Sequence, residues 1–151
     1  MLIQANGDMF TAGNDLEDFL KESTSEADTP RGASNAVKLL YSLAHNVKPI
    51  IAAVNGVAMG GGFEIALACD LIIASDDASF CDPVVTMGVC GVEWFVHPWE
   101  LGPRKAKEML FTAEFVSAEE AHRLGMVNRV VPVDELQEQT LALAKKLLRS
   151  G

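Results

Sequence analysis

An α/β fold, with a parallel sheet covered by helices on both faces, is the fold class that the sequence predicts. Two continuous apolar runs, Ile50–Val54 and Leu71–Ala74, have the length and composition of buried strands. The residues between them, Gly60–Cys69, have the pattern of a short helix. Strands that are apolar on both faces and connected through helices are typical of parallel sheets buried on both sides.

Composition limits the class of protein. A chain of 151 residues, 49% of them hydrophobic, is long enough for one globular domain with one core. Its formal net charge of -9 argues against nucleic acid or an anionic membrane as a partner. Glu64, Asp70 and a glycine cluster interrupt the most hydrophobic stretch, Ile50–Ala74, so we expect no membrane span there.

Cysteine and histidine usage gives no sign of a disulfide framework or a metal site. The cysteines form no C-x-x-C pair, which favours a reducing, cytoplasmic location; they are Cys69, Cys81 and Cys90. The histidines lack metal-like spacing, and we expect surface or packing roles for His45, His97 and His122. The N-terminus lacks the pattern of a signal peptide.

The first third of the chain predicts a strand, two helices and a loop. Leu2–Gln4 has the pattern of a short strand, and Asp15 can cap a short helix after it. Residues 22–32 are polar, and we expect them to form a mobile loop. Ser34 can cap the second helix, whose predicted apolar face is Val37, Leu40, Tyr41 and Ala44.

Three helices and a strand are predicted in the C-terminal half. Pro103 marks the start of a helix that buries Ala106, Met109 and Leu110. Capping boxes at Ser117–Glu120 and Asp134–Gln137 predict the starts of the other two helices, and Val127–Val131 between them predicts the strand. The last helix has one face made of Leu136, Thr140, Leu143, Ala144 and Leu147.

A glycine-rich corner, Asn55–Glu64, is the stretch with the strongest sign of chemistry. A strand ends before it, Gly60–Gly62 turn the chain, and a helix begins. N–H groups at a helix start have no partner within the helix and can donate to negative charge on a ligand. Gly61 and Glu64 are three residues apart, so a backbone donor and a carboxylate share one helix face. The motif fits neither a phosphate loop nor a dinucleotide fingerprint. The alternative is a corner that serves packing alone.

Three blocks of the sequence resemble the enoyl-CoA hydratase/isomerase (crotonase) family. They are Phe10–Leu16 (FTAGNDL), Lys48–Asp70 (KPIIAAVNGVAMGGGFEIALACD) and Ala118–Asn128 (AEEAHRLGMVN). The resemblance implies the ββα-type spiral of the ClpP/crotonase fold, with a mostly parallel sheet flanked by helices. Because family members usually carry further segments at both ends, it also implies that residues 1–151 form a single, partial domain.

The resemblance implies an acyl-CoA thioester as substrate and a site made of backbone donors and carboxylates. The backbone N–H groups of Asn14 and Gly61 would form an oxyanion hole for the thioester oxygen, and Glu64 would be the acid/base. Next to these donors, the substrate-binding positions would be Ala12, Gly13, Gly60 and Gly62. No cofactor is implied besides coenzyme A within the substrate.

The second carboxylate is less clear from the sequence. Hydratases of the family usually have glutamate where this chain has Val84, and the nearby acids are Asp82 and Glu93. Glu93 lies in the loop where some isomerases of the family place their catalytic carboxylate. Asp82 is either an assisting carboxylate or a residue that only fixes its own turn.

Several functions remain open at this point. The first is an enzyme that hydrates or isomerises enoyl-CoA, and the second is a catalytically degenerate protein that binds acyl-CoA or oligomerises. Thioester hydrolysis or decarboxylation is a third, because the oxyanion site is shared across the family. An aromatic cluster of Trp94, Phe95 and Trp99 is expected, part of which could line an acyl pocket with Phe63. The resemblance also implies a homo-oligomer, a trimer or hexamer.

Overall fold

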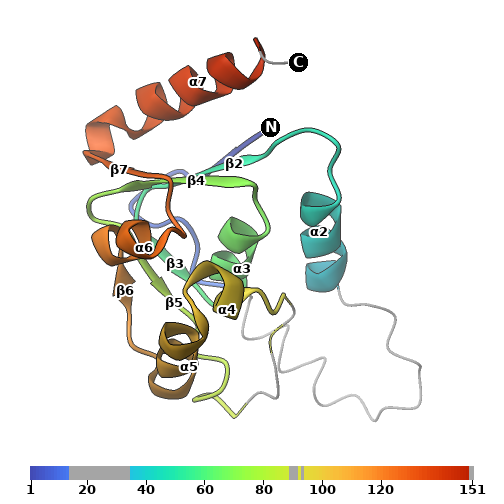
Figure 1. Cartoon of the computed structure of the whole chain (residues 1–151), viewed down its shortest axis with the longest axis vertical. Coiled ribbons are helices and arrows are strands. Elements are labelled where there is room, and N and C mark those ends of the chain that lie inside the picture. The colour runs from blue at the N-terminus through green and yellow to red at the C-terminus, as the bar shows by residue number, and fades with distance from the viewer. Residues whose placement is uncertain (14–34, 89–91, 93, 150–151) are drawn as a thin grey trace.

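The computed structural model describes residues 1–13, 35–88, 92 and 94–149. Two β-sheets share one hydrophobic core with helix α3 (Gly61–Leu67), and further helices pack around them (Figure 1). The helix expected after Asp15, the loop expected over residues 22–32 and the cap expected at Ser34 lie outside the described residues.

The larger sheet has four parallel strands. They are β1 (Leu2–Gln4), β2 (Ile51–Val54), β4 (Leu71–Ser75) and β7 (Arg129–Val131), in the order β1-β2-β4-β7. All four strands were predicted from the sequence within a few residues of these bounds, and the parallel arrangement is confirmed. A side-chain hydrogen bond fixes the start of β2: Asp70 Oδ2 accepts from the backbone N–H of Ile50 at 2.7 Å.

Alternating residues of the larger sheet face two different partners, because successive side chains of a strand point to opposite faces. Ile51, Ala53 and Ile73 face helix α7 (Leu136–Leu147), which lies across one side of the sheet in Figure 1. The intervening residues of the same strands face the core that contains α3 and α6 (Ala118–Leu124): Ala52, Val54, Ile72 and Ala74. The sheet is therefore covered on both faces, as predicted.

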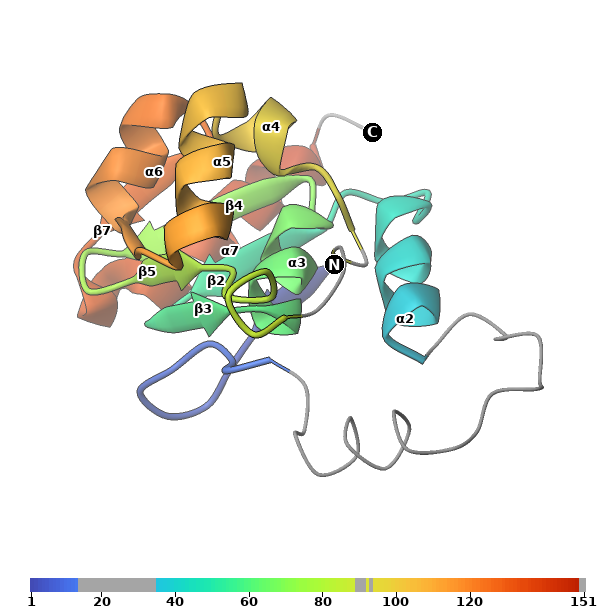
Figure 2. The ribbon, with the colours of Figure 1, turned by 90° about the horizontal axis from the view of Figure 1, so that it is seen from below.

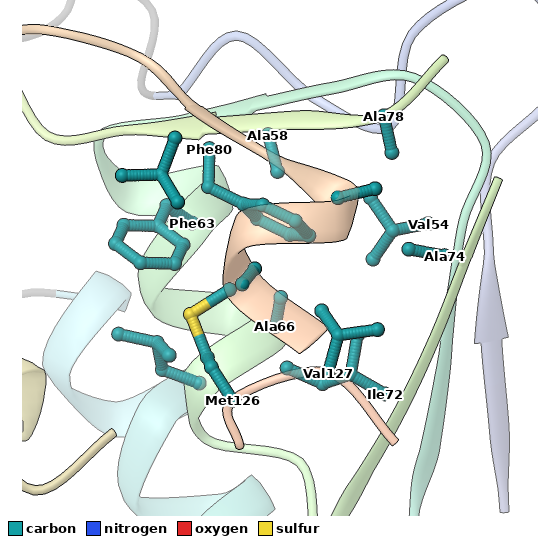
Figure 3. Close-up of a cluster of buried hydrophobic side chains, with 14 of the residues drawn as sticks. Val54, Ala58, Phe63, Ala66, Ile72, Ala74, Ala78, Phe80, Met126 and Val127 are labelled. Atoms are coloured by element: carbon teal, nitrogen blue, oxygen red, sulfur yellow. The ribbon is translucent and has the colours of Figure 1, made fainter. Parts of the chain in front are cut away.

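The smaller sheet was not foreseen. Its strands are β3 (Val57–Met59), β5 (Ser79–Cys81) and β6 (Val116–Ser117), of which β3 and β5 are parallel and β5 and β6 antiparallel. Each has only two or three residues, which is too short to show a periodic pattern. The rings of Phe63 and Phe80 pack 5.6 Å apart in the core between the two sheets (Figure 3).

The remaining helices lie on opposite sides of this core. Helix α2 (Asn35–Ala44) lies beside α3 through Leu40 and Leu43, whereas α4 (His97–Glu100), α5 (Pro103–Thr112) and α6 lie toward the other side (Figure 2). As predicted, α5 begins at Pro103 and buries Ala106, Met109 and Leu110. Among the described residues, no helix has both the length and the apolar character needed to cross a membrane.

Two predictions about aromatic residues are wrong. Trp94, Phe95 and Trp99 do not form one cluster: the Trp99 residue is 77% exposed and Phe95 56%, while Trp94 lies edge-on to Tyr41 with 6.0 Å between ring centroids. Tyr41, predicted for the apolar face of α2, is itself 55% exposed. Aromatic content alone does not determine which face of a short helix is buried, because that depends on the neighbouring elements.

Of the two predicted capping boxes, one is half formed and one is absent. The Ser117 hydroxyl accepts a hydrogen bond from the backbone N–H of Glu120 at 3.2 Å, and Gly125 ends that helix with a φ of 93°. The box at Asp134 is wrong, because the chain enters α7 through a 3-10 turn, Val133–Glu135. The N-cap of α7 is therefore Glu135, and it makes no side-chain cap.

The cap at Ser117 can be tested by substitution. We expect Ser117→Ala to lower the free energy of unfolding by about 1 kcal/mol, because it removes the acceptor for the Glu120 N–H. Ser117→Asn keeps a side-chain oxygen at the cap and is expected to retain most of that stability. Urea unfolding measures both variants, and an equal loss in the two would show that the hydroxyl does not act as a cap.

Candidate functional site

The start of helix α3 presents a backbone N–H group, that of Gly61, for which the described residues supply no acceptor. Gly60, the N-cap, has a φ of 54°, and its N–H donates to Cys81 O at 2.9 Å. The first intrahelical bond runs from Glu64 N to Gly60 O at 3.0 Å. Within the described part of the chain, no carbonyl or side-chain oxygen accepts a hydrogen bond from Gly61 N. The oxyanion role expected for this N–H group stays a prediction.

Residues 10–13 run alongside β3 and end at this helix start. The N–H groups of Phe10 and Thr11 both donate to Val57 O, at 3.0 and 3.1 Å, and Met59 N donates to Thr11 O at 3.0 Å. Gly13 N donates to the hydroxyl of Thr11 at 3.2 Å. The segment is thereby fixed to β3 as an added strand-like edge, with an isolated parallel bridge between Thr11 and Ala58.

Two glycines permit the close approach of this segment to α3. A Cβ on Gly62 would collide with the methyl group of Thr11 and lie 2.8 Å from the Thr11 carbonyl oxygen. A Cβ on Gly13 would lie 3.1 Å from Met59 O and 3.5 Å from Gly61 N, and the φ of Gly13 is 99°. Gly13 therefore lies directly against the Gly61 donor, and residue 14 continues from that point.

The Glu64 side chain is buried beside the same helix start. Glu64 is 1% exposed, and its Oε1 accepts a hydrogen bond from the backbone N–H of Trp94 at 3.3 Å. Gly61 and Glu64 both line a cavity of about 40 Å³. Helix α2 closes the cavity from the other side, and the remaining lining residues are Ala36, Leu39, Leu40 and Ile65. The predicted common face of Gly61 and Glu64 is confirmed.

Asp82 is held away from this cavity. It is fully buried, its Oδ1 accepts from Val84 N at 3.3 Å, and its Oδ2 lies 2.9 Å from Nε2 of His97, which is also fully buried. Of the two roles considered for Asp82, this geometry favours the residue that fixes its turn. Sequence reasoning did not single out His97, since a histidine 15 residues away carries no local pattern that pairs it with Asp82.

Two of the predicted site residues, Asn14 and Glu93, lie outside the described residues, so their roles stay predictions. Ala12 and Gly13 are described, and they lie on the segment beside β3 that leads to residue 14. The described structure thus brings together Gly13, Gly60–Gly62 and Glu64.

The described cysteines are poorly suited to act as nucleophiles. Burial, followed by the neighbouring Asp70 carboxylate, raises the pKa of the Cys69 thiol to about 12. Burial, followed by Asp82, also raises the pKa of the Cys81 thiol. Since the thiolate is the reactive form, neither is available at neutral pH. Within the described residues, no three His, Cys, Asp or Glu side chains gather as a metal site would require.

Comparison with known proteins identifies the family. Residues 1–151 match the family described as enoyl-CoA hydratase/isomerase. The chain belongs to that family. The two-sheet arrangement is the crotonase fold that the sequence resemblance implied.

Several known proteins are similar to this crotonase-family chain. It is 37% identical over 156 residues to crotonyl-CoA hydratase of Syntrophomonas wolfei, covering 100% of this chain and 58% of that protein. It is 41% identical over 144 residues to carnitinyl-CoA dehydratase of Salmonella typhimurium, covering 94% and 54%. The crystal structure of an enoyl-CoA hydratase/isomerase from Xanthobacter autotrophicus superposes with a TM-score of 0.88 at 35% identity, covering 97% and 55%. The chain thus spans little more than half the length of these relatives.

The close approach at Gly62 yields a test of the site's architecture. We expect Gly62→Ala to lower the free energy of unfolding by about 1–3 kcal/mol, because the new methyl group collides with Thr11. Thr11→Ser removes the methyl group of Thr11 and keeps the hydroxyl that binds Gly13 N. The double variant should therefore recover part of the loss in urea unfolding. If the double variant is no more stable than Gly62→Ala, the loss of stability does not come from a collision with the Thr11 methyl group.

Proposed function

We propose that this chain carries the acyl-CoA site of an enoyl-CoA hydratase or isomerase. The observation that supports it is the shared cavity, which a backbone donor, Gly61, and a buried carboxylate, Glu64, both line. A thioester oxygen accepting from Gly61 N would be stabilised as negative charge builds on it. The second donor would be the N–H of Asn14, which follows Gly13, the residue packed against Gly61 N.

In the hydration reaction, Glu64 would take a proton from water as the water oxygen bonds to the β-carbon of the enoyl group. The electron pair of the double bond moves toward the thioester, and the resulting enolate oxygen rests in the oxyanion hole. The proton that Glu64 took from the water would then pass to the α-carbon, which restores the Glu64 carboxylate. A cavity of about 40 Å³ is large enough for a water molecule, since one water needs only about 10–15 Å³ of such volume.

Isomerisation is the second candidate, and a specific observation supports it. Among the described residues, Glu64 is the only carboxylate that lines the cavity, and Val84 occupies the position where hydratases usually have glutamate. One carboxylate suffices to move a proton between the two ends of an allyl system. The catalytically degenerate alternative is a protein that binds acyl-CoA without turnover, and it would show no activity with either substrate.

Substitution of Glu64 tests the proposed acid/base. We expect Glu64→Gln to lower kcat by about 10²–10⁴-fold with a small change in KM, because glutamine keeps the shape and loses the proton-transfer group. Loss of enoyl-thioester absorbance measures the rate. A gain in mass of one water identifies hydration, and conversion of a 3-enoyl to a 2-enoyl thioester without mass change identifies isomerisation. Glu138→Gln, on the exposed side of α7, is the matched control.

Unchanged rates in wild type and Glu64→Gln would remove Glu64 from the mechanism. Absence of turnover in the wild type with both substrates would instead favour the degenerate alternative.

The oxyanion donor can be deleted without removing the helix start. Gly61 is the first residue of α3, a position where proline is tolerated because its N–H has no partner within the helix. We expect Gly61→Pro to lower kcat by about 10²–10³-fold, the usual cost of one lost oxyanion donor. Gly61→Ala adds a side chain and keeps the N–H, so it controls for bulk. Equal losses in the two variants would contradict the role of the N–H.

The cytoplasmic location and the homo-oligomer, a trimer or hexamer, stay predictions. Size-exclusion chromatography with light scattering measures the oligomeric state directly.

A further inference from the structure

The buried pair of Asp82 and His97 has no part in the reaction proposed above. Neither residue is exposed to solvent, and 2.9 Å separates Asp82 Oδ2 from His97 Nε2. The two atoms are within hydrogen-bond distance, and Nε2 is the donor in the tautomer that carries the proton on this nitrogen. A buried carboxylate is costly unless it is paired, so the two side chains depend on each other.

Asp82 connects this pair to the start of helix α3. It follows the last residue of β5, Cys81, whose carbonyl oxygen accepts from the N–H of Gly60 at 2.9 Å. Its second oxygen accepts from Val84 N at 3.3 Å. One carboxylate thus fixes the chain as it leaves β5, next to the N-cap of the helix that carries Glu64.

His97 connects the pair to the group that contacts Glu64. It is the first residue of α4, and its ring lies edge-on to Phe63, the neighbour of Glu64, with 5.4 Å between centroids. Three residues earlier, Trp94 N donates to Glu64 Oε1 at 3.3 Å. The N–H of Val96 in turn donates to Trp94 O at 3.0 Å, so the backbone between Trp94 and His97 is a compact turn.

We propose that Asp82 and His97 are positioning residues for the Glu64 carboxylate. Their hydrogen bond holds the start of α4 against the end of β5, and this holds the Trp94 N–H in place to fix Oε1 of Glu64. Neither residue lines the cavity, and both act through Trp94. The kinetic consequence rests on the proposed function, whereas the effect on the contact between Trp94 and Glu64 does not.

Substitutions at His97 separate the hydrogen bond from the packing. His97→Phe keeps a ring beside Phe63 and removes the donor to Asp82. His97→Gln keeps an N–H donor at the end of the side chain. It removes no other hydrogen bond of the described residues, because Nδ1 of His97 has no partner among them. If His97→Phe fails to fold because the Asp82 charge is left buried, Asp82→Asn/His97→Phe removes that charge and carries the same test.

Selective ¹⁵N-tryptophan labelling tests the contact directly. The chain has two tryptophans, and Trp99 N, which donates to Val96 O at 2.9 Å, is the internal control for Trp94. We expect Glu64→Gln to shift the backbone amide signal of Trp94 and not that of Trp99. This response should persist in the His97→Gln background and be lost in the His97→Phe background. A response of Trp94 that survives His97→Phe overturns the proposal.

Steady-state kinetics of the full chain with an enoyl-CoA thioester tests the consequence. We expect His97→Phe to lower kcat by about tenfold or more with KM unchanged, and His97→Gln to retain most of the rate. In the Glu64→Gln background, His97→Phe should cause no further fall, because both changes act through one carboxylate. An equal fall in both backgrounds overturns the positioning role. If wild type shows no turnover, the proposed function fails, and the Trp94 signal alone decides this inference.

Discussion

The packing of one backbone against another, residues 10–13 against the strand–helix corner, is the constraint on which the site depends. The backbone N–H of Thr11 donates to Val57 of β3, and the Thr11 carbonyl oxygen accepts from Met59 of the same strand. Gly62 has no room for a side chain where Thr11 packs against it. Glycine is needed at position 62 because it has no Cβ, and not because the backbone there has a positive φ. This contact places Gly13 against Gly61 N, so two segments nearly 50 residues apart in sequence meet at one donor.

Polar residues of the three sequence blocks that resemble the family differ in their structural surroundings. Glu64 is buried and lines a cavity, where it is the acid/base of the proposed function. Asp70 and Asn128 lie in the same blocks, yet each uses a side-chain oxygen to accept from a backbone N–H at 2.7 Å, that of Ile50 just before β2 and that of Ile72 in β4. These two side chains fix strand starts, so a polar residue in such a block is not by itself a catalytic residue.

Among the described residues, elements from three parts of the chain surround Glu64. Helix α3 carries the carboxylate, α2 closes the cavity, and the residues before α4 supply the N–H of Trp94. The described neighbours contact Glu64 through a backbone N–H or line the cavity with apolar side chains, so the local sequence of each says little about this contact. The same holds for Asp82 and His97, which meet because β5 and α4 are adjacent in space.

Sequence alone determined the strands of the larger sheet, the start of α5, the cap of α6 and the common face of Gly61 and Glu64. The signals for these features are hydrophobic runs, a proline, a serine and helical spacing, and each of them acts locally. It did not determine the smaller sheet, whose strands are too short to show a period. It also missed the exposure of Trp99 and the entry to α7 through a 3-10 turn. Only tertiary structure decided that Asp82 pairs with His97 and that Thr11 crosses Gly62, because both contacts depend on segments that sequence order keeps apart.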